Sequence, residues 1–112
     1  MNGYDSTKVS VIDLSAKSLP EIIKEIELRP LMWLPEKHIM YCWTFLAGYL
    51  YTSNDPVSHS LMKDFDVFIN EKYNIRTAHG WAKNINHMCS NPHDAMDKFF
   101  KEFKEFMETY DT

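Results

Sequence analysis

The chain has 112 residues, of which 45% are apolar and 25% charged, so it is not intrinsically disordered and suits one globular domain. Its formal net charge of −4 disfavours nucleic-acid binding, because phosphate groups repel an acidic surface. Two cysteines, Cys42 and Cys89, are too few for a disulfide scaffold and predict a reducing, cytoplasmic location.

The first 17 residues predict a flexible or extended N-terminal arm. Within it, the segment Val9–Leu14 (VSVIDL) alternates apolar and polar residues at its start, which indicates an extended backbone. We expect this arm to lie across the helices or to pair with another chain. It lacks a basic region followed by an apolar run, so no signal peptide is expected. The longest uncharged stretch is shorter than the ~20 residues of a membrane span.

Residues 18–112 predict one all-α domain, a bundle of about five helices that are mostly antiparallel. The first helix begins at Ser18, where Glu21 completes a capping box. It ends at Arg29, because Pro30 disfavours a helical conformation in the residue before it. Residues 29–35 (RPLMWLP) predict a linker whose large apolar side chains fold back onto the core.

Residues 39–52 (IMYCWTFLAGYLYT) contain no charged residue and predict the central, most buried helix, opened by Glu36. Apolar residues occur on several sides, so we expect this helix to be packed on more than one face. The inner residues expected from the spacing are Ile39, Cys42, Trp43, Leu46, Tyr49 and Leu50. Gly48 costs about 1 kcal/mol within a helix relative to alanine, which suggests a close helix crossing at this point.

Three further helices are expected in the second half of the chain. One covers residues 57–73, with Leu61, Phe65, Phe68 and Ile69 facing inward. A second covers residues 78–89, with Thr77 as its cap and Trp81, Ile85 and Met88 facing inward. The last begins at Asn91 and Pro92 and has the most regular apolar period in the chain: Met96, Phe99, Phe100, Phe103, Phe106, Met107 and Tyr110.

The residues that could support catalysis do not form a recognised pattern. No pair of the five histidines has the i, i+4 spacing of a helical zinc site, so we expect no metal. Three glycines cannot form the usual phosphate-binding loop, and no cofactor is expected. Both cysteines lie in apolar helical patterns, where burial makes a thiol inert. The sequence therefore predicts a protein that is not an enzyme, with a thiol- or histidine-dependent enzyme as a minor alternative.

Residues 26–49 (IELRPLMWLPEKHIMYCWTFLAGY) carry a family resemblance. An Arg-Pro pair, then Met, an aromatic residue and Leu, precede a helix that ends in Phe-x-x-Gly-Tyr. This pattern resembles the small bacterial immunity proteins of contact-dependent growth-inhibition and related polymorphic toxin systems. The matching residues here are Arg29, Pro30, Met32, Trp33, Leu34, Phe45, Gly48 and Tyr49. This chain has Leu31 and Pro35 where the family often has glycine.

The resemblance implies a cytoplasmic inhibitor that binds a cognate toxin domain, commonly a basic nuclease, and blocks its active site. Our candidates for toxin binding are Trp33 in the linker and three carboxylates, Glu36, Asp64 and Glu71. An acidic surface would attract a basic partner, although the same charge also serves solubility alone. The alternative function is a stand-alone helical interaction module, with a homodimer as one form of it.

Overall fold

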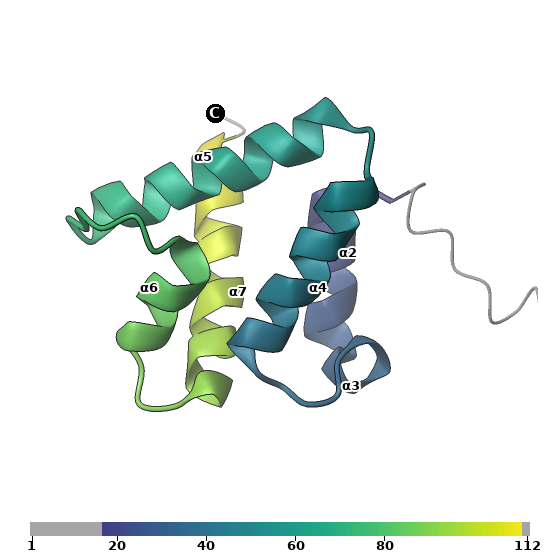
Figure 1. Ribbon diagram of the computed structural model, residues 1–112, viewed down its shortest axis with the longest axis horizontal. Helices are drawn as coiled ribbons and strands as arrows, with labels where there is room; N and C mark the ends of the chain where they lie inside the picture. The colour runs from purple at the N-terminus through teal and green to yellow at the C-terminus, as the bar shows by residue number, and fades with distance from the viewer. Residues whose placement is uncertain (1–16, 111–112) are drawn as a thin grey trace, which may run out of the picture.

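The computed structural model describes residues 17–110 and contains only helices there (Figure 1). The predicted all-α class is therefore confirmed, with six helices in this range rather than about five. Their bounds are α2 (Leu19–Leu28), α3 (Pro30–Trp33), α4 (Ile39–Thr52), α5 (Pro56–Lys72), α6 (Trp81–His87) and α7 (Pro92–Tyr110). The additional helix is α3, a single turn in the segment expected to be a linker. The arm predicted for residues 1–17 lies, apart from Lys17, outside the described residues.

Two predicted helix starts are confirmed by their hydrogen bonds. At α2, the Ser18 hydroxyl accepts from the Glu21 backbone N–H at 3.4 Å, and the Glu21 carboxylate accepts from the Ser18 N–H at 2.8 Å. This reciprocal capping box satisfies two backbone donors. At α7, the side-chain oxygen of Asn91 accepts from the Asp94 N–H at 2.8 Å. In both helices, a short polar side chain caps the start that its position in the sequence predicted.

Two other helix starts differ from expectation. The central helix covers Ile39–Thr52 as predicted, but Glu36 does not open it, because His38 acts as the cap: its ring Nδ1 accepts from the Met40 N–H at 3.1 Å. The next-to-last helix begins at Trp81, and Thr77 does not cap it. Gly80 occupies the cap position with φ of +90°, a conformation that residues with a side chain rarely adopt.

The longest helix, α7, is the one around which the others are arranged. It contacts α4, α5 and α6. The expectation of mostly antiparallel helices is wrong for α5, which lies crosswise over the ends of α4 and α7 (Figure 1). Only α7 brings four phenylalanines into the core on one helix: Phe99, Phe100, Phe103 and Phe106.

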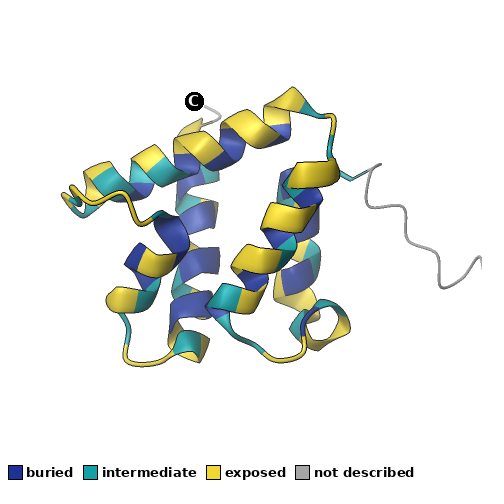
Figure 2. Ribbon diagram, in the orientation of Figure 1, coloured by how far each residue is buried: buried dark blue, intermediate teal, exposed yellow. Residues whose placement is uncertain are grey.

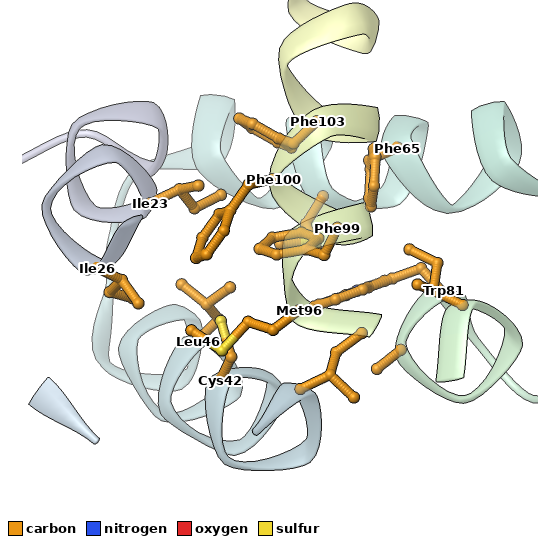
Figure 3. Packing of buried hydrophobic residues seen from close by; sticks show 14 of the residues in the cluster. Ile23, Ile26, Cys42, Leu46, Phe65, Trp81, Met96, Phe99, Phe100 and Phe103 are labelled. Atoms are coloured by element: carbon orange, nitrogen blue, oxygen red, sulfur yellow. The ribbon is translucent and has the colours of Figure 1, made fainter. Parts of the chain in front are cut away.

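Aromatic rings fill the centre of the core. Phe65 on α5 is fully buried, and its ring centroid lies 5.4–5.7 Å from those of Trp81, Phe99, Phe103 and Phe106. Such edge-to-face pairs contribute beyond their buried area. Aliphatic residues of α2 and α4, among them Ile23, Ile26 and Leu46, close the other side (Figure 3). Two residues expected to face inward are exposed: Met88 lies just after α6, and Tyr110 lies at the end of α7.

The main correction concerns α4, which is not the most buried helix. Its inner stripe of Ile39, Cys42, Leu46 and Tyr49 is buried as expected, but the opposite half faces solvent (Figure 2). Trp43, expected to face inward, is 43% exposed. We call the exposed half the α4 outer face; it consists of Tyr41, Trp43, Thr44, Ala47, Gly48 and Tyr51.

Gly48 also differs from its prediction. We expected a close helix crossing at this glycine, yet a Cβ placed there would have no heavy atom within 4 Å. Its cost to helix stability is therefore not explained by packing among residues 17–110. The uncharged composition of α4 indicated burial, but the exposed half shows that apolar and small residues also occur at the surface.

Candidate protein-docking surface

The segment Leu28–Glu36 places an exposed apolar cluster at one end of the molecule. Leu28 ends α2, and the single turn of α3 presents Leu31 and Met32; the three side chains are 66%, 70% and 56% exposed. Only Leu34 of this segment is buried, so the expectation that the linker folds back onto the core is correct for Leu34 and wrong for Met32. We call Leu28, Leu31, Met32, Trp33 and Glu36 the α3 corner.

Proline explains why these side chains are exposed. Pro30 fixes the first turn of α3, where its missing N–H is not needed, and Pro35 follows directly after the buried Leu34. With four residues, α3 is too short to direct all of its apolar side chains toward the core. This segment exposes three large apolar side chains within five residues. Such a cluster is typical of a protein-docking patch rather than of a loop that only faces solvent.

Trp33 is half-buried and belongs to both the core edge and the α3 corner. Its ring packs edge-to-face on Phe45 of α4, with centroids 5.9 Å apart and planes at 71°. Its indole nitrogen is buried and has no hydrogen-bond partner in the described part of the chain. Trp33 therefore orients α3 against α4, and its remaining exposed surface is available to a partner.

The three candidate carboxylates fall in two places. Glu36 is exposed in the bend before α4 and belongs to the α3 corner. Asp64 and Glu71 are exposed on α5, two turns apart, where Asp64 accepts a hydrogen bond from the Tyr110 hydroxyl at 3.3 Å. The structure brings Trp33 and Glu36 into one short segment and places Asp64 and Glu71 on a different helix.

A groove of about 500 Å³ adjoins the α3 corner on the α7 side. Lys37, Lys101 and Lys104 line it together with Glu27 and Asp97, and Lys37 pairs with Asp97 at 2.5 Å. The mixed charge neither selects an anion nor forms a metal site. Within residues 17–110, no group of three histidine, cysteine or acidic side chains is arranged to hold a metal ion.

A charged cluster between α5 and α7 was missed in the sequence. Glu102 is only 2% exposed, and its carboxylate accepts hydrogen bonds from Lys72 Nζ at 2.7 Å and from the Tyr73 hydroxyl, with Lys98 Nζ at 3.5 Å. Burial by itself raises the pKa of Glu102, but the bonds from Lys72 and Tyr73 outweigh it and hold the pKa below its ordinary value.

The sequence contained a signal for this cluster. Glu102 lies between Phe99 and Phe106 on the apolar stripe of α7, three residues after the first and four before the second. A carboxylate at such a position needs a cationic partner. The cluster is enclosed by the helices that it joins, and we assign it to stability.

Cys42 has the buried thiol that the sequence predicted. Cys42 is fully buried, and burial raises the pKa of its thiol to about 12, so it remains protonated at neutral pH. Cys89 is half-buried and also unpaired.

Comparison of the chain with family models, curated proteins and solved structures returned no match. Among the helices of residues 17–110, none combines the length and apolar content that a bilayer crossing needs.

Proposed function

We propose that this protein is an immunity protein that binds a basic nuclease toxin domain and blocks its active site. The observation that supports this function best is the α3 corner: an exposed apolar cluster with a carboxylate, which includes Met32 and Trp33 of the segment that resembles the immunity family. Large side chains at the centre of an interface supply most of its binding energy, and carboxylates at its rim attract a cationic partner.

The charge of the chain favours a basic partner. The net charge is −4; the exposed Glu36 belongs to the α3 corner, and the exposed Glu27 lies beside it at the groove that also holds Lys37, Lys101 and Lys104. Nucleases that bind phosphate backbones carry clustered cations, so an acidic surface fits the place where their substrate binds. Asp64 and Glu71 on α5 would then raise the association rate without touching the partner.

The test is a pair of substitutions with the same change in charge, Glu36→Lys and Glu71→Lys. The binding partner is the purified product of the gene immediately upstream, which the proposal identifies as the toxin, and its affinity is measured by isothermal titration calorimetry. We expect Glu36→Lys to weaken binding at least tenfold more than Glu71→Lys, because only Glu36 meets the partner directly. Both variants lose the same long-range attraction, so Glu71→Lys is the matched control.

Equal weakening by both substitutions would show that the α3 corner is not the docking surface. No binding by the unsubstituted protein would contradict the proposed function itself.

A further inference from the structure

We propose that two copies of this chain associate through their α4 outer faces, with the two α4 helices antiparallel. No charged residue occurs in α4, whereas every other described helix longer than one turn carries charged side chains. Figure 2 shows this half of α4 exposed along its length. Burying it removes apolar groups from water and leaves no charge unpaired. None of its residues belongs to the α3 corner, so this proposal does not depend on the proposed function.

The charge of the chain favours a second copy as the occupant of this face. Each copy has a net charge of −4, so two copies repel one another wherever their acidic surfaces meet. At the α4 outer face, two identical copies touch without bringing like charges together. A partner with a charged contact surface would have its charges buried without a counter-ion here. The uncharged face is therefore suited to another uncharged face, which a second copy supplies.

The order of side chains along the face is symmetric. Four residues follow one another at spacings of three, four and three, which places them on one side of the helix: Tyr41, Thr44, Gly48 and Tyr51. Large rings stand at both ends and small residues in the middle. In a two-fold pair, a contact between two different residues is always made twice. Antiparallel helices centred between Thr44 and Gly48 therefore bring each small residue opposite a small residue, and each tyrosine opposite a tyrosine.

This pairing explains Gly48. Glycine destabilises the interior of a helix relative to alanine, yet a Cβ at Gly48 would have no heavy atom within 4 Å among the described residues. The distance between two packed helices depends on the size of the side chains at their crossing. With Gly48 opposite Thr44 and Ala47 beside them, two α4 helices approach closely and gain dispersion contacts along their backbones.

The hydroxyl groups on this side of α4 do not oppose burial. The Thr44 hydroxyl donates a hydrogen bond to the Met40 carbonyl at 2.9 Å, and the Thr52 hydroxyl donates one to the Tyr49 carbonyl at 3.1 Å. Both donors are thus paired within the helix. Covering them with a second copy leaves no donor unsatisfied, which would otherwise weaken the contact.

The two tyrosines gain most from the pairing. Tyr51 is 91% exposed, more than any other large apolar side chain in the described part of the chain. The ring of Tyr41 is held against the ring of His38, with centroids 4.9 Å apart. When Tyr51 of one copy lies against Tyr41 of the other, each ring has an aromatic neighbour across the contact.

The area of the face sets the strength of the dimer. Tyr41, Trp43 and Tyr51 are 42%, 43% and 91% exposed. Because an aromatic side chain buries about 150–250 Å², these rings offer on the order of 350 Å² on each copy. A stable dimer buries about 800 Å² on each partner, and weak, transient contacts bury less. We therefore expect a reversible dimer with a dissociation constant on the order of 100 µM.

The experiment is sedimentation velocity of the full chain at concentrations from about 5 µM to about 500 µM. We expect the unsubstituted protein to change from monomer to dimer over this range. Ala47→Glu should remain monomeric throughout, because it places like charges opposite one another near the two-fold axis. Val67→Glu introduces the same charge at an exposed apolar residue of α5 and should dimerise like the unsubstituted protein. Far-UV circular dichroism verifies that both variants are helical.

Gly48→Ala separates the dimer from the stability of the helix. At about 5 µM, where the protein is monomeric, we expect a higher midpoint of urea denaturation, because alanine is the better helix former. We expect the dissociation constant of the dimer to rise at least fivefold, because the added methyl group holds the two helices apart.

A cross-link tests the antiparallel orientation. Tyr41→Cys and Tyr51→Cys proteins are mixed and oxidised, with Cys89 replaced by serine in both and one protein labelled with heavy nitrogen, so that intact mass identifies each disulfide. Cys42 is fully buried and does not compete. Only the mixed dimer brings the two introduced thiols together, so we expect the mixed disulfide in at least tenfold excess over either homodisulfide.

Four results would overturn the proposal. A monomer at every concentration would show that no dimer forms. Equal weakening by Ala47→Glu and Val67→Glu would place the contact elsewhere. An unchanged dissociation constant in Gly48→Ala would show that the helices do not cross at this glycine, and an excess of homodisulfides would show that they are parallel.

Discussion

Replacing Phe65 with alanine is expected to lower the free energy of unfolding by about 3–5 kcal/mol, the largest effect of any single substitution considered for this chain. Phe65 is fully buried, and its ring contacts those of Trp81, Phe99, Phe103 and Phe106, which belong to α6 and α7. The substitution leaves a cavity where three helices meet. Since domains of this size are stable by only about 5–15 kcal/mol, the variant should lose a large part of its stability.

Urea denaturation followed by circular dichroism measures this loss. If Phe65→Ala does not fold, Phe65→Leu keeps the site apolar and should lose about 1–2 kcal/mol. Val67→Ala is the control, because Val67 lies on the same helix and is 47% exposed; it should change stability by less than about 0.5 kcal/mol. Equal losses for Phe65→Ala and Val67→Ala would contradict the central position of Phe65 in the core.

Glu102→Gln is expected to cost about 2–3 kcal/mol at neutral pH, because it removes the buried charge that Lys72 neutralises and to which the Tyr73 hydroxyl donates a hydrogen bond. The amide also leaves part of the donor cluster unpaired in a site where the carboxylate is only 2% exposed. Glu105→Gln is the matched control. Glu105 pairs with the same Lys72 at 2.8 Å but is 45% exposed, so its loss should cost less than about 1 kcal/mol.

The pH dependence of stability distinguishes a charge effect from a packing effect. The folded pKa of Glu102 lies below its ordinary value of 4.5, because the bonds from Lys72 and Tyr73 outweigh the effect of burial. The carboxylate therefore stabilises the fold above its unfolded pKa, and this contribution is lost as the pH falls through the folded pKa. The difference between the unsubstituted protein and Glu102→Gln should shrink below about pH 4. If the difference in the free energy of unfolding stays constant from pH 7 to pH 3, the loss comes from changed packing and not from the removed charge.

Local rules predicted most of the helices. The capping box at Ser18 and the Asn91 cap fixed two helix starts, and Pro30 fixed the end of α2, because each acts through its nearest backbone groups. The regular period of α7 likewise identified Phe99, Phe103 and Phe106 as core residues. These features depend on sequence distances of three or four residues, which the chain itself displays.

The exposure of α4 could not be predicted in the same way. Its residues are uncharged on every side, so the pattern does not distinguish a helix surrounded by protein from a helix with one free half. Tyr51 and Trp43 are exposed because no further helix among the described residues covers them. Which helices surround another is decided by the long-range packing of the whole domain.

The candidate docking surface was partly predictable. Trp33 and Glu36 were identified from the sequence, and the structure adds the exposed Leu28, Leu31 and Met32 beside them. Their exposure depends on α3 being a separate turn, which the spacing of Pro30 and Pro35 did not reveal. Asp64 and Glu71 share a face of α5 as their seven-residue spacing implies, but the sequence did not show that they lie apart from Glu36.

The measurement that tests the proposed function most directly is a nuclease titration. The product of the gene immediately upstream, which the proposed function identifies as the toxin, is held at a fixed concentration, and its cleavage of RNA or DNA is followed as this protein is added. We expect activity to fall linearly and to disappear at one molecule of this protein per toxin molecule. Full nuclease activity in a tenfold molar excess of this protein would contradict its role as an immunity protein.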